Sequence, residues 1–274
     1  MILRLYIALI LLISPRVLHS QDVSKQEIRA AFLSDLERDL WEKGVDEPFN
    51  LFQAVDAQKL ERDLWEKLIT ELDAKKDRTR KDYNFIRALF QKSHKRLFKD
   101  YQQHATFNET LTTGKFDCVS GSAALGMLLS RYGYDFDIIE TDYHVFIMVE
   151  LEDRDIILES TLPVGGLISR SSDVKAYLDS YKPKEDAKLN SLNTRIGTTE
   201  IELGDNSIFR KVNLTQLAGL LYYNDAIFDF NSQKYESAAI QLTKAYSLYE
   251  SDRILGLKEL SEELASGKAL LADN

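Results

Sequence analysis

The order of hydrophobic and polar residues predicts helices at both ends of the chain. Across residues 21–104 hydrophobic side chains recur at helical spacing, and Gly44 and Pro48 are the helix breakers before residue 101. Helical spacing returns at residues 214–249, as two helices joined by a turn, and at residues 254–271 as a third helix. We therefore expect helical regions on both sides of a different central region.

The central region, residues 105–205, combines one helix with short strands. A helix of small residues is predicted at 119–131, where Gly133 ends it. Runs of β-branched and aromatic residues follow, and a polar connection of hairpin size separates the last two. These strands are expected at residues 136–140, 143–150 and 155–159. The pattern predicts an α+β fold, in which the helix packs on a small antiparallel sheet between the terminal helical regions.

The segment after Pro163 is predicted to be a connector. It is largely polar, and one strand is expected within it, at residues 198–203. The chain is thus predicted to have an N-terminal helical region at residues 21–104, a central core at 105–205 and a C-terminal helical region at 206–274. Residues 1–20 precede these regions as a separate segment.

Residues 1–20 have the pattern of a secretory signal peptide. Arg4 precedes a nine-residue apolar run, at 5–13, and Ser20 supplies a small residue near the expected cleavage site. The run is shorter than the roughly 20 apolar residues of a membrane span. We expect the mature chain to have no membrane span and to be secreted, in the periplasm or outside the cell.

One eight-residue sequence occurs twice in the N-terminal region. Residues 36–43 and 60–67 both read LERDLWEK, and each copy contains one of the two tryptophans. Each copy has one apolar stripe and a charged opposite face. A partner-binding helix pair is one interpretation, but paired apolar stripes more often pack on a core, and we favour that interpretation.

Charge argues against nucleic acid as a ligand. The net charge is −9, and it becomes −11 if residues 1–20 are removed. A basic segment with interleaved aromatics spans residues 75–101, but Ile86, Phe90, Leu97 and Tyr101 recur at helical spacing. We expect these four side chains to face the core and the cations to face water.

The single cysteine, Cys118, is the main candidate for chemistry. One thiol excludes an internal disulfide, a redox pair of cysteines and a multi-cysteine zinc site, and no metal or cofactor is expected. Cys118 is predicted to lie at a helix N-terminus, where the helix dipole favours the thiolate, although Asp117 opposes this effect.

His144 and Glu159 are candidates to act with this thiol. The midpoint between them falls at the predicted hairpin turn, so they are expected to be directly opposite one another on neighbouring strands. A carboxylate there would accept the imidazole N–H. A nucleophile, a base and an orienting acid in this arrangement form a Cys-His-acid triad.

The segment at residues 107–165 resembles the transglutaminase-like superfamily of papain-fold cysteine enzymes. The similarity lies in the order of Gly114-x-x-Asp-Cys118, a small-residue helix, His144 and Glu159-Ser-Thr-x-Pro163. It implies a papain-like core, with Cys118 as nucleophile, His144 as general base and acid, and Glu159 as its orienting residue. Glu159 stands where Asp is commoner, and Val119 follows the cysteine where animal-type transglutaminases have an aromatic residue. Both differences favour hydrolysis over protein cross-linking.

The expected function is therefore hydrolysis of a peptide or protein amide through an acyl-enzyme. The Cys118 backbone N–H and the side chain of Gln102 or Gln103 are candidate oxyanion donors. The alternative is a non-catalytic binding or scaffold protein built on the same core. Residues 214–249 resemble a single tetratricopeptide repeat, with Ala238, Leu242 and Ala245 at packing positions, and this C-terminal region could hold a protein partner.

Overall fold

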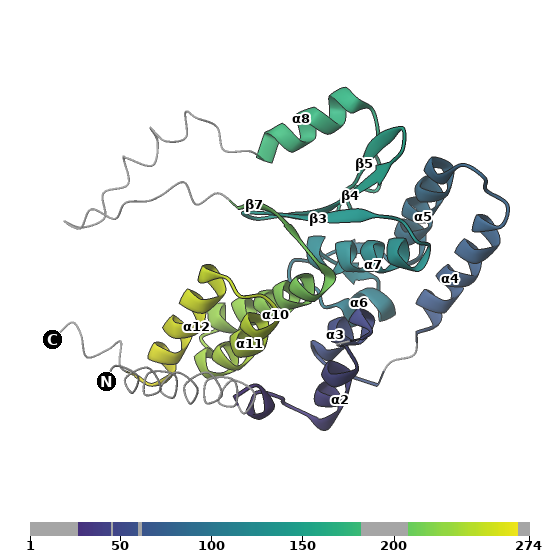
Figure 1. Ribbon diagram of the computed structural model, residues 1–274. Coiled ribbons are helices and arrows are strands. Elements are labelled where there is room, and N and C mark those ends of the chain that lie inside the picture. Colours follow the sequence, from purple (N-terminus) through teal and green to yellow (C-terminus); the bar gives the residue numbers. More distant parts are fainter. Residues whose placement is uncertain (1–26, 45, 60–61, 182–207, 268–274) are drawn as a thin grey trace, which may run out of the picture.

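The computed structural model describes residues 27–44, 46–59, 62–181 and 208–267. The predicted signal peptide and the strand predicted at 198–203 lie outside these ranges. The fold is α+β, with a five-stranded antiparallel sheet between helical layers (Figure 1).

The sheet has the strand order β6-β5-β4-β3-β7. Its strands are β3 (Phe136–Thr141), β4 (Val145–Leu151), β5 (Arg154–Leu158), β6 (Leu167–Ile168) and β7 (Phe209–Val212). The first three match the predicted strands to within two residues at each end. The short edge strand β7 pairs with β3, so the C-terminal region contributes a strand to the central sheet.

Side chains alternate between the two faces of this sheet. Val145 and Ile147 face the main hydrophobic core, whereas Phe146 belongs to a smaller cluster with Ile139 and Ile157. The helix α7 (Cys118–Arg131) packs on the first face, and α8 (Ser171–Tyr181) covers the second. Figure 1 shows α7 and α8 on opposite sides of the sheet. The expectation of a connector after Pro163 was wrong over α8, because a helix there covers Phe146.

The N-terminal region is helical, as predicted. Its helices are α2 (Asp35–Gly44), α3 (Pro48–Ala54), α4 (Asp63–Lys76) and α5 (Asp82–Arg96), and α6 (Phe107–Thr112) follows. Between α5 and α7, β1 (Asp100–Tyr101) pairs in parallel with β2 (Lys115–Phe116). On α5, Phe85, Ile86, Leu89 and Phe90 are buried. Tyr101 is 55% exposed, so the expectation that it faces the core was wrong.

The two tryptophans of the duplicated sequence pack against the core. Trp41 on α2 contacts Tyr222, and Trp65 on α4 contacts Phe49 and Phe107. This agrees with the core-packing interpretation.

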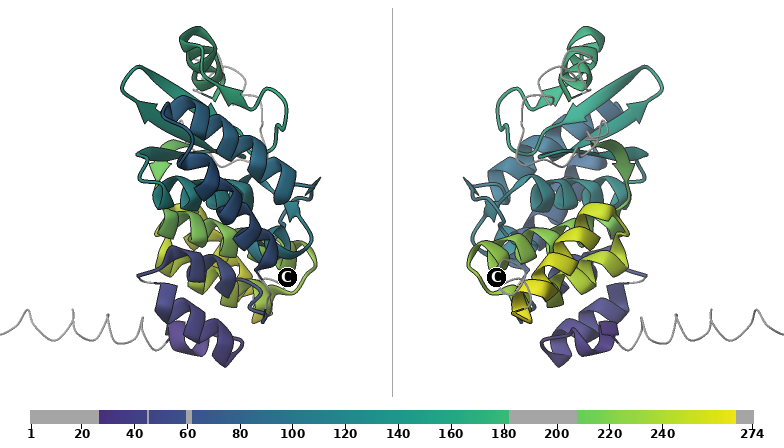
Figure 2. Two further views of the ribbon diagram at one scale, coloured as in Figure 1. Left: turned by 90° about the vertical axis from the view of Figure 1, so that its right-hand side faces the viewer. Right: turned by 90° about the vertical axis from the view of Figure 1, so that its left-hand side faces the viewer.

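The C-terminal region contains α10 (Leu214–Asn231), α11 (Tyr235–Leu248) and α12 (Asp252–Ala265). Ala238, Leu242 and Ala245 on α11 are fully buried, and Gly219 on α10 allows close approach to the Ala245 carbonyl. Both views of Figure 2 show α8 at one end of the molecule and these helices towards the other, with the sheet and α7 between.

Two buried carboxylates connect the C-terminal helices to the rest of the protein. Glu140 on β3 accepts hydrogen bonds from Arg210, Tyr249 and Arg253. Glu37 on α2 pairs with the fully buried Lys244 on α11, at 2.6 Å. These contacts connect the C-terminal helices to β3 of the sheet and to α2.

Candidate functional site

The local sequence fixes the start of α7 at Cys118. Asp117 is its N-cap residue: its Oδ1 accepts the Ser120 N–H at 2.8 Å, and the Asp117 N–H donates to Ser120 Oγ at 2.9 Å. This reciprocal capping box satisfies two backbone donors. Gly114, at φ 80°, supplies the turn before β2. The helix therefore begins one residue earlier than predicted, at the candidate nucleophile.

A tight turn places His144 at the start of β4. The Thr141 N–H donates to the His144 carbonyl at 2.8 Å, which closes the connection between β3 and β4. Tyr143, at the tip of this turn, is 97% exposed, whereas the His144 side chain is 19% exposed.

The register of the next hairpin differs by two residues from the prediction. Ile147 pairs with Leu158, so Glu159 continues the ladder opposite Phe146, rather than opposite His144. A shift of two residues keeps side chains on the same face because strand side chains alternate with a period of two. His144 and Glu159 are thus diagonal neighbours, and His144 Nε2 is hydrogen-bonded to Glu159 Oε2.

Glu159 is only 2% exposed, and hydrogen bonds hold its carboxylate in place. Oε1 accepts the Thr161 N–H at 2.8 Å and the Thr161 hydroxyl at 2.6 Å; Oε2 accepts the Tyr177 hydroxyl at 2.6 Å. Burial acts to raise the pKa of Glu159, but the bonds from His144, Thr161 and Tyr177 outweigh it, and the net pKa is lowered. The carboxylate is therefore ionised at neutral pH.

The imidazole–carboxylate pair contacts α8, whereas the thiol contacts the main core. The His144 ring stacks on Tyr181, and Cys118 packs against the hydrophobic cluster around α7. Cys118 and His144 both line a cavity of about 280 Å³ at the start of β4. Within the described ranges no hydrogen bond joins the thiol to His144, so the structure shows the His-Glu pair formed and the thiol on the same cavity.

The thiol is protonated in this environment. Burial raises the pKa of Cys118 to about 12, and the negative charge of Asp117 adds to this effect. The Val145 N–H, directed at the sulfur, acts in the opposite direction. The expected lowering by the helix N-terminus is thus outweighed by burial and by the capping carboxylate.

The two glutamines proposed as oxyanion donors differ in position. The Gln102 N–H donates to the Phe116 carbonyl, so the chain beyond β1 runs beside the residues that precede α7. Gln103 lines the cavity that contains Cys118, whereas Gln102 lines an adjoining cavity instead. Gln103 is the better placed of the two.

Several residues at the site were not predicted from the sequence. Tyr101, His104 and Arg253 line the cavity with Cys118, and Tyr177 holds Glu159. Short parallel pairing of β1 with β2 brings the first two there, and no local pattern signals such a pairing. Tyr177 lies on the helix that the sequence prediction missed.

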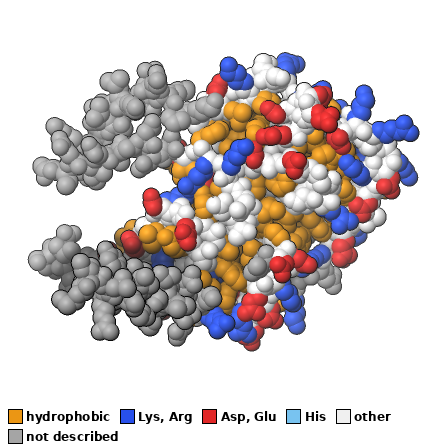
Figure 3. Space-filling model, viewed as in Figure 1, with side chains coloured by type: hydrophobic (Ala, Val, Ile, Leu, Met, Phe, Trp, Pro, Cys, Tyr) orange, Lys and Arg blue, Asp and Glu red, His pale blue; other side chains and the backbone are white. Residues whose placement is uncertain are grey.

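No metal site was expected, and the described part of the chain contains no group of three His, Cys, Asp or Glu side chains placed to hold a metal ion. Of the histidines, His94 lies among Phe90, Phe98 and Phe116, and burial lowers its pKa to about 4. In the ranges described, no helix has the length and apolar character to cross a membrane. On the face in Figure 3, acidic and basic side chains are interspersed.

In comparisons with known proteins, no family model matches the chain, and neither a curated protein nor a solved structure matches it. The fold and the site therefore define the class on their own: an α+β protein in which a cysteine at a helix N-terminus lines the same cavity as the histidine of a histidine–glutamate pair.

Proposed function

We propose that this protein is an exported thiol hydrolase of the transglutaminase-like class, which cleaves a peptide or other amide bond. The observation that carries the proposal is the hydrogen bond between the buried Glu159 carboxylate and His144 Nε2. His144 lines a cavity that Cys118 also lines. A buried carboxylate is costly unless it is paired, and here four donors hold it in one position. This arrangement fixes the imidazole, as an orienting acid does in a triad.

The contact with Glu159 assigns the two ring nitrogens. Nε2 carries the proton that is donated to the carboxylate, so Nδ1 has the free lone pair. Nδ1 is therefore the general base that removes the Cys118 proton and the general acid that later returns it.

The reaction would proceed through an acyl-enzyme. Sulfur attacks the amide carbonyl carbon as Nδ1 takes the thiol proton, and the C–N bond breaks as Nδ1 protonates the leaving amine. Water then attacks the thioester, gives a proton to Nδ1 and releases a carboxylic acid; the proton returns to sulfur. Because burial raises the pKa of Cys118 to about 12, the thiol is protonated at neutral pH, and in the proposed reaction its proton moves to Nδ1 as sulfur attacks.

Charge on the carbonyl oxygen would be stabilised by the Cys118 N–H and the Gln103 side chain. Gln103 lines the same cavity as the thiol. Preorganised donors of this kind are each worth roughly 3–4 kcal/mol of the activation barrier. Gln102 lies on the adjoining cavity and is the less favoured donor.

The remaining parts of the proposal concern the ends of the chain. Residues 1–20 would direct export to the periplasm or the extracellular space. The pair of α10 and α11 would be a tetratricopeptide-like unit that packs on the core. The arrangement of α7 on an antiparallel sheet supports the proposed papain-like core.

The test is turnover by purified protein on a mixture of peptides, with products identified by mass spectrometry. We expect cleavage by the native protein, and loss of cleavage in Cys118→Ala and His144→Ala. Acid quenching should trap an acyl group on Cys118. Asp153→Asn, on an exposed hairpin turn, is the matched control and should cleave normally. Equal cleavage by native protein and Cys118→Ala would contradict the proposal.

A non-catalytic binding protein is the second candidate, because the half-buried thiol is protonated and makes no hydrogen bond to His144 within the described residues. In that case peptides would bind equally to native protein and Cys118→Ala, and neither protein would form product or an acyl adduct.

A further inference from the structure

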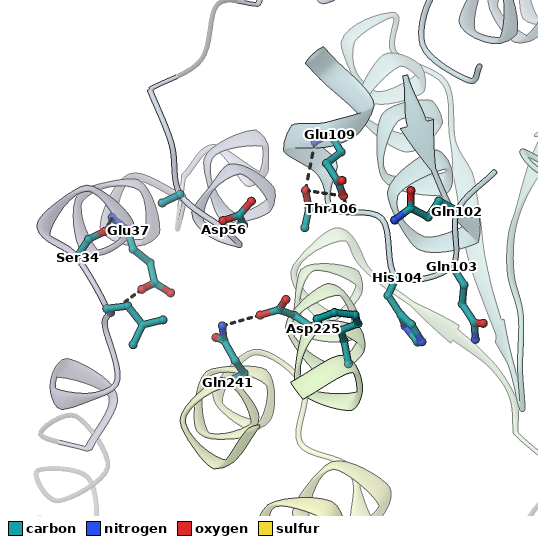
Figure 4. Close-up of a pocket in the computed structure, with 13 residues that line it drawn as sticks. Ser34, Glu37, Asp56, Gln102, Gln103, His104, Thr106, Glu109, Asp225 and Gln241 are labelled. Carbon is teal, nitrogen blue, oxygen red and sulfur yellow. Dashed lines mark hydrogen bonds between the residues drawn. The ribbon is translucent and has the colours of Figure 1, made fainter. Parts of the chain in front are cut away.

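A second cavity, of about 470 Å³, adjoins the one that contains Cys118. Gln103 and His104 line both, and so form the wall between them. Figure 4 shows side chains from α2, α10, α11 and the α6 N-terminus around this second cavity. Four carboxylates line it, from Glu37, Asp56, Glu109 and Asp225. No lysine or arginine is among its described lining residues.

Two of these four carboxylates already have partners that satisfy them. Glu37 forms the buried ion pair with Lys244, and Glu109 belongs to the capping box of α6. The other two accept hydrogen bonds from neutral amides: Asp56 from Gln58 and Asp225 from Gln241. Among the described residues neither Asp56 nor Asp225 forms an ion pair. The lining of the cavity therefore carries net negative charge, which the nearby Lys244 offsets only in part.

Gln241 provides an independent indication of a ligand. The residue is 6% exposed and lines the cavity, and its Nε2 donates to Asp225 at 2.6 Å. Its Oε1 is buried and has no hydrogen-bond partner in the structure. A buried acceptor without a donor costs about 1–3 kcal/mol. A ligand that carries N–H donors would satisfy this oxygen and the two carboxylates together.

Two exposed apolar side chains also line the cavity: Leu33 is 64% exposed and Phe228 is 56% exposed. Carboxylates together with apolar side chains suit a cation on an aliphatic stem, because such side chains bury their methylenes and direct the charged group to a polar site. Arginine and lysine side chains have this form. The planar guanidinium has five donors, which suits several acceptors at once.

We propose that this second cavity binds an arginine or lysine side chain of the peptide whose amide bond is cleaved at Cys118. This proposal rests on the proposed function, which identifies the bound peptide as the substrate. The cation would lie against Asp225, Asp56 and Gln241 Oε1, with Gln103 and His104 between it and the thiol. The protein would then select peptides that carry a positive side chain near the cleaved bond.

The first experiment measures binding without turnover, by calorimetry on Cys118→Ala. The probes are N-acetyl-arginine amide and its uncharged isostere N-acetyl-citrulline amide. We expect the arginine probe to bind at least about 10-fold more tightly, since one lost charged contact corresponds to roughly this factor. Adding Asp225→Asn or Asp56→Asn should remove the difference, whereas Asp153→Asn should not. Asp56 has φ 55°, a conformation that Asn adopts readily, so Asp56→Asn is expected to fold.

Equal affinity for the two probes, absence of binding, or an unchanged preference in both pocket variants would overturn the proposal. The second experiment compares kcat and KM for arginine-containing and citrulline-containing peptides. Asp56→Asn should raise KM for the arginine peptide and leave kcat nearly unchanged. If probe binding depends on Asp56 but no peptide is cleaved, the proposed hydrolase fails and the cation site stands. If cleavage shows no charge preference, the cation site fails and the hydrolase stands.

Discussion

Asp117 and Glu159 act on opposite partners of the candidate site. Asp117 caps α7 and places a negative charge beside the thiol, which helps to raise the pKa of Cys118. Glu159 is hydrogen-bonded to His144 Nε2 and so fixes the orientation of the imidazole. In the proposed reaction, the first carboxylate keeps the thiol protonated, and the second orients the imidazole that removes the thiol proton.

The first prediction separates capping by Asp117 from its charge. Asp117→Asn should lower the pKa of Cys118, because the negative charge is removed while Asn remains a good N-cap residue. A pH titration of the thiolate absorbance in the ultraviolet measures this change. Asp155→Asn, on an exposed part of β5, is the control and should leave the titration unchanged. An unchanged or higher thiol pKa in Asp117→Asn would show that the carboxylate does not act on the sulfur.

The second prediction concerns the bond from Tyr177 to Glu159. The folded-state pKa of Glu159 is lowered from 4.5, so its stabilising effect is present above that pH and is lost as the pH falls through the folded value. Tyr177→Phe removes one donor and should raise the folded pKa. Loss of stability on acidification should then begin at a higher pH than in native protein. Urea unfolding at a series of acidic pH values tests this; superimposable pH profiles would contradict it.

At the scale of elements, the start of α7 depends on one close approach. Gly121 faces the loop after β5, and a Cβ there would lie 2.7 Å from Ser160 Oγ and 2.8 Å from Ser160 Cβ. Ser160 is fully buried and adjoins Glu159. The small residue therefore lets α7, which begins at Cys118, pack beside the loop that contains Glu159 and Ser160.

The third prediction follows from this contact. Gly121→Ala should destabilise the protein by about 1–3 kcal/mol, the usual cost of overpacking, and should reduce any Cys118-dependent cleavage. Gly256→Ala is a matched control, since nothing lies within 4 Å of a Cβ at that helical position. It should stabilise α12 by roughly 0.5–1 kcal/mol. Both changes are measured by chemical denaturation, and equal effects of the two substitutions would refute the argument.

Local sequence patterns predicted the helix and the strands that carry the candidate site residues, but not the helix α8 that packs on the other face of the sheet. The strands β3, β4 and β5 follow from runs of β-branched residues, and α7 follows from small residues ended by Gly133, whose φ is 72°. The hairpin register was wrong by two residues, yet the predicted contact of His144 with Glu159 formed because the error preserved the face. The helix α8 was not predicted, because it packs over Phe146, which lies in a distant part of the sequence.

At the scale of the whole molecule, a buried ion pair joins the two ends of the chain. Lys244 on α11 is fully buried and contacts Glu37 on α2, which also accepts the Tyr222 hydroxyl at 3.2 Å. Glu37 belongs to the first copy of the duplicated sequence but not to the apolar stripe of that copy. The sequence pattern therefore did not indicate that its charge is buried and paired. Sequence could not predict this pair because the partners are about 200 residues apart.

The fourth prediction is that Lys244→Met destabilises the protein by about 3–5 kcal/mol, since it leaves the Glu37 charge buried without a cation. The double variant Glu37→Gln with Lys244→Met should be less destabilised, because no unpaired charge remains. Chemical denaturation of the two proteins provides the comparison. A double variant less stable than Lys244→Met alone would mean that the cost arises from lost packing.

The second cavity is also a feature of the whole molecule, because Asp56, Gln103 and Asp225 come from distant parts of the chain. Burial raises the pKa of Asp225 from 3.8 to about 6; Asp229, Asp56 and Glu37 add to the increase, and Lys244 opposes it. A raised folded pKa gives stability at low pH that is lost as the pH rises through the folded value. The contribution of Asp225 to the stability of native protein should therefore become less favourable as the pH rises from about 4 to about 6.

The fifth prediction is that Asp225→Asn lacks this loss. Its free energy of unfolding, relative to native protein, should be more favourable at pH 7.5 than at pH 4, because the variant has no carboxylate to ionise. The arginine probe should stabilise native protein more at the higher pH and should have little effect on the variant. Urea unfolding with and without the probe measures both effects. If the difference in free energy of unfolding between variant and native protein does not change with pH, ionisation of Asp225 costs the folded protein no stability. The cavity would then have no unfavourable charge for a cation to neutralise.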